Sequence, residues 1–234
     1  MEAKRLFYPE AGVDLERMRC RAREVVRSSS LIGRAFHGDR SAAAVLHIGF
    51  WPFVREFERA IDRHPFPTRS LMRRFGPAAR DKLHVIAGDV RAMRDEEDVH
   101  SKHWQEDARS LGLQSLEGPI APKVVDLLRW AYVKDHARFF SVLAGTELVA
   151  EELGAFLISS REFTELFERK RWIWGEIHVV SQGDRPSHLD IDLDLARATA
   201  ADPQDAARLE SWVVETIELF GEAADQVEGG LLPP

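Results

Sequence analysis

Residues 82–113 read KLHVIAGDVRAMRDEEDVHSKHWQEDARSLGL, and this stretch decides the fold. Its apolar residues recur at spacings of three and four, which is the period of one face of an α-helix. We therefore predict one long helix over this range, closed by Gly112. The apolar face consists of Leu83, Ile86, Val90, Met93, Trp104, Ala108 and Leu111.

Two polar residues interrupt this apolar face. Glu97 and His100 occupy the positions that bridge Met93 and Trp104. A carboxylate and an imidazole on a buried face are costly unless they are paired or bound to a metal ion. This pair is therefore the first indication of what the chain does.

Composition sets broad limits on fold class, partners and location. The 234 residues suffice for one large or two small domains, and 44% apolar with 30% charged residues is typical of a globular protein. A net charge of −7 argues against nucleic acid as the main partner. The N-terminus lacks the apolar core of a signal peptide, and no apolar run reaches the ~20 residues of a membrane span. We expect a cytoplasmic protein that does not bind membranes.

Helical periodicity continues along the rest of the chain, and no convincing strand appears. Ser29, Ser30 and Gly33 are expected to interrupt helical structure after residues 15–28. Pro52 is expected to kink or break the helix over 40–64 near Gly49. We predict a single all-α domain over 1–234, with about seven or eight helices and frayed ends at 1–12 and 229–234. Helical periodicity covers the segments 15–28, 40–64, 68–75, 82–113, 122–135, 136–159, 161–181, 188–200 and 205–227.

Polar residues lie on the apolar faces of later predicted helices as well. Glu147 bridges Leu143 and Ala150 within 136–159, and His178 continues an aromatic face within 161–181. His188 and Asp192 are four residues apart, so both side chains can point at one object.

Carboxylates and imidazoles together are the ligand set of non-haem iron or manganese. Helical bundles hold such ions with inward glutamates and Glu-x-x-His pairs, and Glu97 and His100 have this spacing. We therefore predict a metal site, with a metal-free polar active site and purely structural polar residues as alternatives. His103 lies off the apolar face and is expected at the edge of the site, and Glu58 is a weaker case of an inward carboxylate.

Three stretches resemble the haem-oxygenase-like superfamily. This superfamily includes the haem-oxygenase-like di-iron oxidases, pyrroloquinoline-quinone synthase and the thiaminase-II proteins. Residues 50–61, FWPFVREFERAI, are similar to its aromatic second helix. Residues 100–104, HSKHW, followed by LGL at 111–113, look like its His-x-x-Leu-Trp and Leu-Gly signature. The third stretch is GTE at 145–147, with EEL at 151–153 behind it.

The resemblance implies a seven-helix bundle with a central pocket. In the di-iron branch, the metal ligands are a glutamate and a histidine on one helix, a glutamate on a later helix, and a late His-x3-Asp-x2-3-His cluster. Carried onto this sequence, these ligands correspond to Glu97, His100, Glu147, His178 and His188.

The late cluster departs from the pattern of the superfamily. The position four after His178 is Gln182, not aspartate, and Asp184 and Asp192 are the substitutes, each four residues from His188. One iron, two irons and no metal therefore all remain open. Thiaminase activity is not expected, because Cys20 is the single cysteine and lies far from these positions in sequence.

These observations predict an iron-dependent oxidase or oxygenase. One or two Fe(II) ions would be the cofactor, O2 the co-substrate, and a small organic acid, amino acid or biosynthetic intermediate the substrate. The alternatives are a metal-free, quinone-synthase-like enzyme with His100 and His178 as acid and base, and a non-catalytic helical protein, such as a homodimer, with a closed core around Glu97. The expected metal ligands are Glu97, His100, Glu147, His178, His188 and Asp192, and the expected pocket residues are Phe50, Phe53, Phe57, Glu58, Trp104 and Trp174.

Overall fold

The computed structural model describes residues 14–77, 80–179, 187–201 and 203–231, and within these ranges every regular element is a helix. The predicted all-α fold class is confirmed. The helices are α1 (Leu15–Ser28), α2 (Ser30–Phe36), α3 (Arg40–Arg63), α4 (Thr68–Phe75), α5 (Arg80–Ser110), α6 (Pro122–Ala131), α7 (His136–Ile158), α8 (Arg161–Thr164), α9 (Ile173–Val179), α10 (His188–Thr199) and α11 (Pro203–Leu231).

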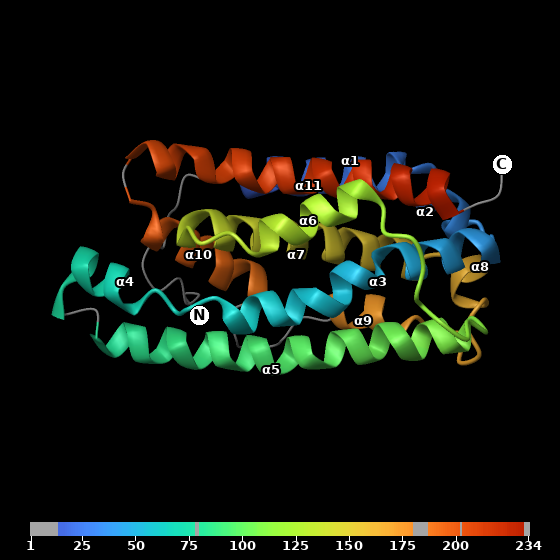
Figure 1. Ribbon diagram of the computed structural model, residues 1–234, viewed down its shortest axis with the longest axis horizontal. Coiled ribbons are helices and arrows are strands. Elements are labelled where there is room, and N and C mark those ends of the chain that lie inside the picture. Colours follow the sequence, from blue (N-terminus) through green and yellow to red (C-terminus); the bar gives the residue numbers. More distant parts are fainter. Residues whose placement is uncertain (1–13, 78–79, 180–186, 202, 232–234) are drawn as a thin grey trace.

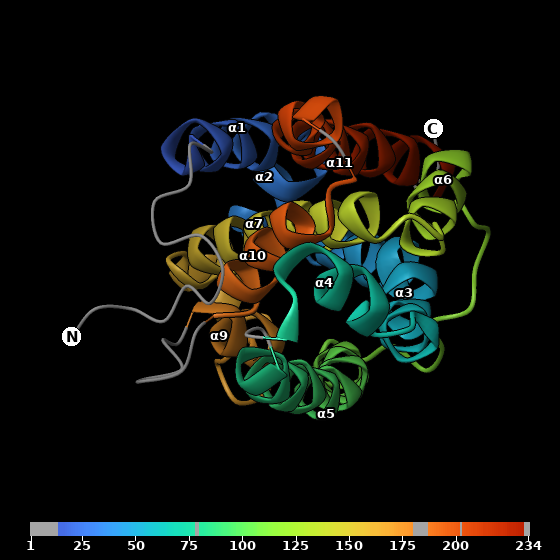
Figure 2. The ribbon, with the colours of Figure 1, turned by 90° about the vertical axis from the view of Figure 1, so that its left-hand side faces the viewer.

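Helix α7 lies at the centre of the bundle. Its residues from Phe139 to Ala150 are all buried, so this part of the helix is covered on all sides. α1 and α11 pack on one side of α7, α9 and α10 also contact it, and α5 packs against α3 and α9. Figures 1 and 2 show α1 and α11 along one side of the molecule and α5 along the opposite side.

Short polar side chains begin many of the helices. The side chain of each accepts a hydrogen bond from a backbone N–H of the first turn, which satisfies a donor that the helix itself cannot pair. Ser187 and Asp190 form a capping box at the start of α10, and this fixes where His188 enters the bundle. The residues that cap by their side chains are Asp14, Ser29, Asp39, Asp135, Ser160 and Ser187.

Helix α3 runs through Gly49 and Pro52 as one element, so of the predicted kink or break near Gly49 the break is excluded. Gly49 has a packing role instead, because a Cβ built there would lie 2.1 Å from Cγ1 of Val227. The missing side chain lets α3 and α11 approach closely.

Two predicted boundaries differ for tertiary reasons. Ser29 ends α1 as predicted, but it also caps α2, a second helix that contains Ser30 and Gly33 and buries Leu31, Ile32 and Ala35. The single helix predicted over 161–181 is divided into α8 and α9, with Lys170 at a φ of 53° between them. Both differences raise the helix number above the predicted seven or eight.

The ends of the predicted helices are close to those observed. Gly112, with a φ of 84°, follows α5 as predicted. α11 continues through residues 229–231, which were expected to be frayed, whereas 1–12 and 232–234 lie outside the described residues. No helix in the described ranges combines the length and apolar character that crossing a membrane requires.

Candidate metal centre

Four helices bring the six predicted ligands into one region. Glu97 and His100 come from α5, Glu147 from α7, His178 from α9, and His188 and Asp192 from α10. α7 contacts both α9 and α10, and α5 contacts the same two helices. The helical periodicity and this packing place the six side chains between the helices.

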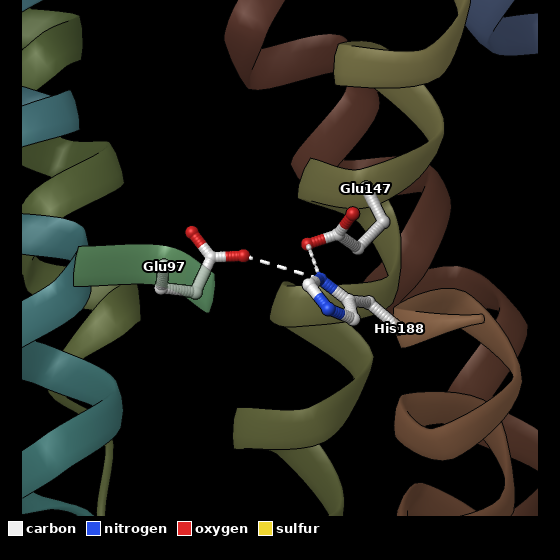
Figure 3. A group of neighbouring side chains, drawn as sticks. All are labelled: Glu97, Glu147 and His188. Atoms are coloured by element: carbon white, nitrogen blue, oxygen red, sulfur yellow. Dashed lines mark ion pairs between the residues drawn. The ribbon is translucent and has the colours of Figure 1, made fainter. Parts of the chain in front are cut away.

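Glu97, Glu147 and His188 form the centre of the group (Figure 3). One ligand atom from each residue lies within 4.8 Å of the other two. Nδ1 of His188 is 3.2 Å from Oε1 of Glu97 and 3.7 Å from Oε1 of Glu147. The exposed fraction of each residue is below 9%, so bulk water does not screen these groups.

His100 and His178 flank this trio. Nδ1 of His100 is 2.8 Å from Oε2 of Glu97, and its ring centroid is 4.5 Å from that of His178. Nδ1 of His178 is 2.7 Å from the carbonyl oxygen of Trp174, so Nδ1 carries the proton and donates it. In that tautomer, Nε2 of His178 is the nitrogen able to accept a proton or bind a metal.

Asp192 is the least satisfied member of the group. It is 1% exposed, and neither carboxylate oxygen has a hydrogen-bond partner among the described residues. Burial and the neighbouring charge of Glu147 raise the pKa of Asp192 well above its ordinary value. Buried carboxylates without partners are rare in folded proteins, and a bound cation is one arrangement that satisfies them.

The other side chains of the centre form ion pairs without Lys or Arg. Burial alone would raise the pKa of Glu97, but the charges of His100 and His188 and their hydrogen bonds hold it below its ordinary value. Burial opposes the charged form of His188 too, yet Glu147 and Glu97 raise its pKa to about 12. In the described part of the chain, the ion pairs of Glu97 and Glu147 are all with imidazoles.

A mainly apolar cavity adjoins the centre. It encloses about 790 Å³, including the part open to solvent, and its wall includes Glu97, His100, Glu147 and His178. Five of the six predicted pocket residues also line it, namely Phe50, Phe53, Phe57, Trp104 and Trp174. The sixth, Glu58, is half-buried on α3 and does not line the cavity.

Three other predicted positions have different outcomes. Gln182 and Asp184 lie outside the described residues, which leaves Asp192 as the described late carboxylate. His103 is half-buried, its Nδ1 is 3.5 Å from Oε2 of Glu106, and it does not line the cavity.

Two carboxylates that support the centre were missed by the sequence interpretation. Oε2 of Glu96 is 2.9 Å from Nε2 of His188, whereas Nδ1 of the same ring faces Glu97 and Glu147. Glu96 therefore holds the ring of His188 from the other side. Asp107 of α5 accepts hydrogen bonds from the backbone N–H groups of Ile173 and Trp174, which begin α9. Glu96 is half-buried beside the apolar face of α5, so the hydrophobic pattern does not single it out. Asp107 is 2% exposed and lies three residues after Trp104 and four before Leu111, so the same spacing that identified Glu97 and His100 could have found it.

No protein-family model and no curated protein matches the sequence. Among solved structures, a TenA homolog from Pseudomonas syringae pv. tomato matches with a TM-score of 0.65 and 17% sequence identity. The match covers 91% of this chain and 90% of that chain. It shows that the chain has the all-helical bundle that the resemblance to the haem-oxygenase-like superfamily predicted.

The position of Cys20 bears on the thiaminase-II branch of that superfamily. Cys20 is exposed on α1, its Sγ is 3.7 Å from Oε1 of Glu16, and it does not line the cavity. Because it is the single cysteine of the chain, no cysteine lies beside the buried carboxylates and imidazoles. The likeness to the TenA homolog, at 17% sequence identity, is one of fold.

Proposed function

We propose that the protein is an iron-dependent oxidase or oxygenase that uses O2 to oxidise a small molecule held in the apolar cavity. One observation carries this proposal: Glu97, Glu147 and His188 converge from three helices at one point near the cavity. Two carboxylates and an imidazole with room for further ligands suit non-haem Fe(II).

The surrounding groups fit a divalent cation. Asp192 offers two buried oxygens without partners, and His100 and His178 offer further nitrogens within reach of Glu97. Iron bound by this donor set supplies the one-electron chemistry that reaction with O2 requires. The mixture of carboxylate oxygens and imidazole nitrogens favours iron or manganese over magnesium, which prefers oxygen ligands alone.

The residues of the chain have distinct roles in this proposal. Glu97 and Glu147 supply negative charge, and Glu96 fixes the ring of His188 so that Nδ1 faces them. The carbonyl oxygen of Trp174 fixes the ring of His178 in the same manner. Aromatic side chains of α3 and α9 exclude water from the remaining cavity wall.

The two alternatives make different use of the same features. A metal-free enzyme would use His100 and His178, which both line the cavity, as acid and base. A non-catalytic protein predicts a closed core around Glu97, whereas Glu97 lines a cavity. A cytoplasmic location, a small-molecule substrate, and the absence of nucleic-acid and membrane partners stay predictions.

The test is anaerobic loading of metal-free protein with Fe(II), followed by measurement of bound iron and of O2 uptake. We expect at least one tightly bound iron per chain and iron-dependent O2 uptake. The Glu147→Gln variant should lose both, because a neutral amide is a weak ligand. The matched control is Glu152→Gln on the same helix, where Glu152 pairs with Arg23, 3.1 Å away.

The outcomes separate the interpretations. Wild-type protein that holds no iron and consumes O2 equally with and without Fe(II) would refute the proposal. Substrate turnover by rigorously metal-free protein would favour the acid–base enzyme instead. Equal iron binding by the Glu147→Gln and Glu152→Gln variants would refute the ligand assignment alone.

A further inference from the structure

The cavity has its polar groups at one end only. Among the described residues that line it, Glu97, His100, Glu147 and His178 carry the ionisable side chains. The other polar side-chain groups of the lining are the two indoles and the hydroxyl group of Thr146. Oγ1 of Thr146 already donates to the carbonyl oxygen of Val142, 2.9 Å away. The rest of the wall is made of Val25, Val26, Ile32, Leu46, Phe50, Phe53, Val54, Phe57, Trp104, Val149, Ala150, Leu153, Trp174, Phe220, Gly221 and Ala224.

The apolar part of the cavity extends across the bundle. Its polar lining comes from α5, α7 and α9, whereas Val25, Phe220 and Ala224 belong to α1 and α11. Figures 1 and 2 place α5 and α11 on opposite sides of α7. The ring of Phe220 contacts that of Phe53, with centroids 5.2 Å apart, so the aromatic wall is continuous from α3 to α11.

The distal half of the cavity offers no partner for a charge. Among the residues that the structure describes, no lysine or arginine lines it. The nearby cations of α1 are engaged elsewhere, since Arg23 pairs with Glu152 and Arg19 with Glu151, and none of these four residues lines the cavity. An ion placed among apolar side chains without a partner is strongly disfavoured.

We infer that the substrate has an uncharged hydrocarbon body, aliphatic or aromatic, which lies in the apolar cavity toward α1 and α11. Any polar or charged group is confined to the end beside Glu97 and Glu147. This inference rests on the proposed function in taking the cavity as the substrate site, and it narrows the predicted substrate class. Amino acids and diacids with charges at both ends do not fit, whereas molecules with one polar end do.

The first test compares octylamine with 1,8-diaminooctane as probes for metal-free protein, by calorimetric titration. Both can place one ammonium group beside the carboxylates, but only the diamine must carry a second charge into the apolar end. We expect octylamine to bind and the diamine to bind about 100-fold more weakly. Binding of the diamine within tenfold of octylamine, or no binding of octylamine, would overturn the inference.

The second test locates the body of the ligand. Ala224 is buried on the distal wall, and leucine there fills the space that an eight-carbon chain needs. We expect Ala224→Leu to weaken octylamine at least tenfold and to leave butylamine unchanged, which also shows that the variant is folded. The matched control is Asp225→Leu, which adds a larger apolar side chain at an exposed position of the same helix. Equal octylamine binding by both variants would show that the chain does not reach α11.

The outcome of these two tests does not depend on whether the proposed function is correct, because they use metal-free protein. Discrimination between the two amines without any iron binding would leave an apolar ligand site and refute the oxidase. Iron binding and O2 uptake without discrimination would leave the oxidase and refute the inferred substrate class.

Discussion

His188 is held from both sides of its ring by carboxylates. Nδ1 faces Glu97 and Glu147, whereas Nε2 is 2.9 Å from Oε2 of Glu96. A histidine that binds a metal through one nitrogen usually donates its other N–H to a carboxylate or carbonyl group, which fixes the tautomer and ring orientation. Glu96 is therefore a positioning residue for the proposed ligand.

Replacement of Glu96 tests this role. We expect Glu96→Ala to weaken Fe(II) binding about 10- to 100-fold, because His188 loses the group that orients it. Glu96→Gln retains an acceptor oxygen and should recover part of the affinity. The measurement is anaerobic Fe(II) titration, with Asp95→Ala as a control at an exposed neighbouring position. Wild-type affinity in Glu96→Ala would show that Glu96 does not position His188.

The residues of the site differ in how far sequence could predict them. Glu97, His100 and Glu147 stand at positions where an apolar residue is expected, so helical periodicity alone brings them inside. Glu96 is next to Glu97 and is half-exposed, so its pattern is that of a solvated side chain. Its partner lies 92 residues away, and only the packing of α10 against α5 reveals the pair.

The first backbone N–H groups of helix α9 are capped by a residue of another helix. Both carboxylate oxygens of Asp107 on α5 accept hydrogen bonds from the first backbone N–H groups of α9, at 3.2 and 2.8 Å. The sequence predicted a continuous helix over 161–181, because a cap supplied by a distant segment leaves no local pattern. Trp172, fully buried just before α9, likewise packs there against Phe163 and Trp174.

Asp107 should make the stability of the protein depend on pH. Burial raises its pKa from 3.8 to about 6, so folding favours the protonated form. The stability that this form contributes is present at low pH and is lost as the pH rises from about 4 to about 6. The Asp107→Asn side chain is neutral at every pH, so the stability of this variant lacks this dependence.

The measurement is urea denaturation of wild type and Asp107→Asn between pH 4 and 7. We expect the free energy of unfolding of the variant, relative to wild type, to rise by about 2 kcal/mol over this window. The comparison cancels the titration of all other groups that both proteins share. A difference that stays constant with pH would contradict the prediction.

At the scale of the whole molecule, the proposed centre links distant parts of the chain. Its trio comes from α5, α7 and α10, so a bound ion would connect segments that begin at residues 80, 136 and 188. We expect saturating Fe(II), at 100 times its dissociation constant, to raise the free energy of unfolding by about 2.7 kcal/mol. Anaerobic denaturation measures this rise, which should be absent in Glu147→Gln. Equal stabilisation of both proteins would show that iron binds elsewhere.

The bundle as a whole was more predictable than its helix number. Amphipathic periodicity predicted the long helices within a few residues, because each buries one face against the core. Helix α7 was predicted from the same periodicity, although its residues 139–150 are buried on all sides. The short helices α2, α8 and α9 depend on contacts with other segments, which explains why they were merged or missed. Phe36 of α2 stacks on Phe156, Phe163 of α8 packs against Trp172, and Asp107 of α5 caps α9.

The burial of residues 139–150 of α7 on all sides also has a consequence for synthesis of the protein. Its apolar surface leaves the ribosome long before α10 and α11 can cover it, since α7 ends at residue 158 and α11 at residue 231. At typical translation rates these 73 residues take roughly 4 to 15 seconds. During this interval the apolar residues 139–150 of α7 are exposed on the nascent chain, without the later helices that cover them in the folded protein. The segment that supplies Glu147 is therefore also where chaperones and neighbouring nascent chains have the best opportunity to bind.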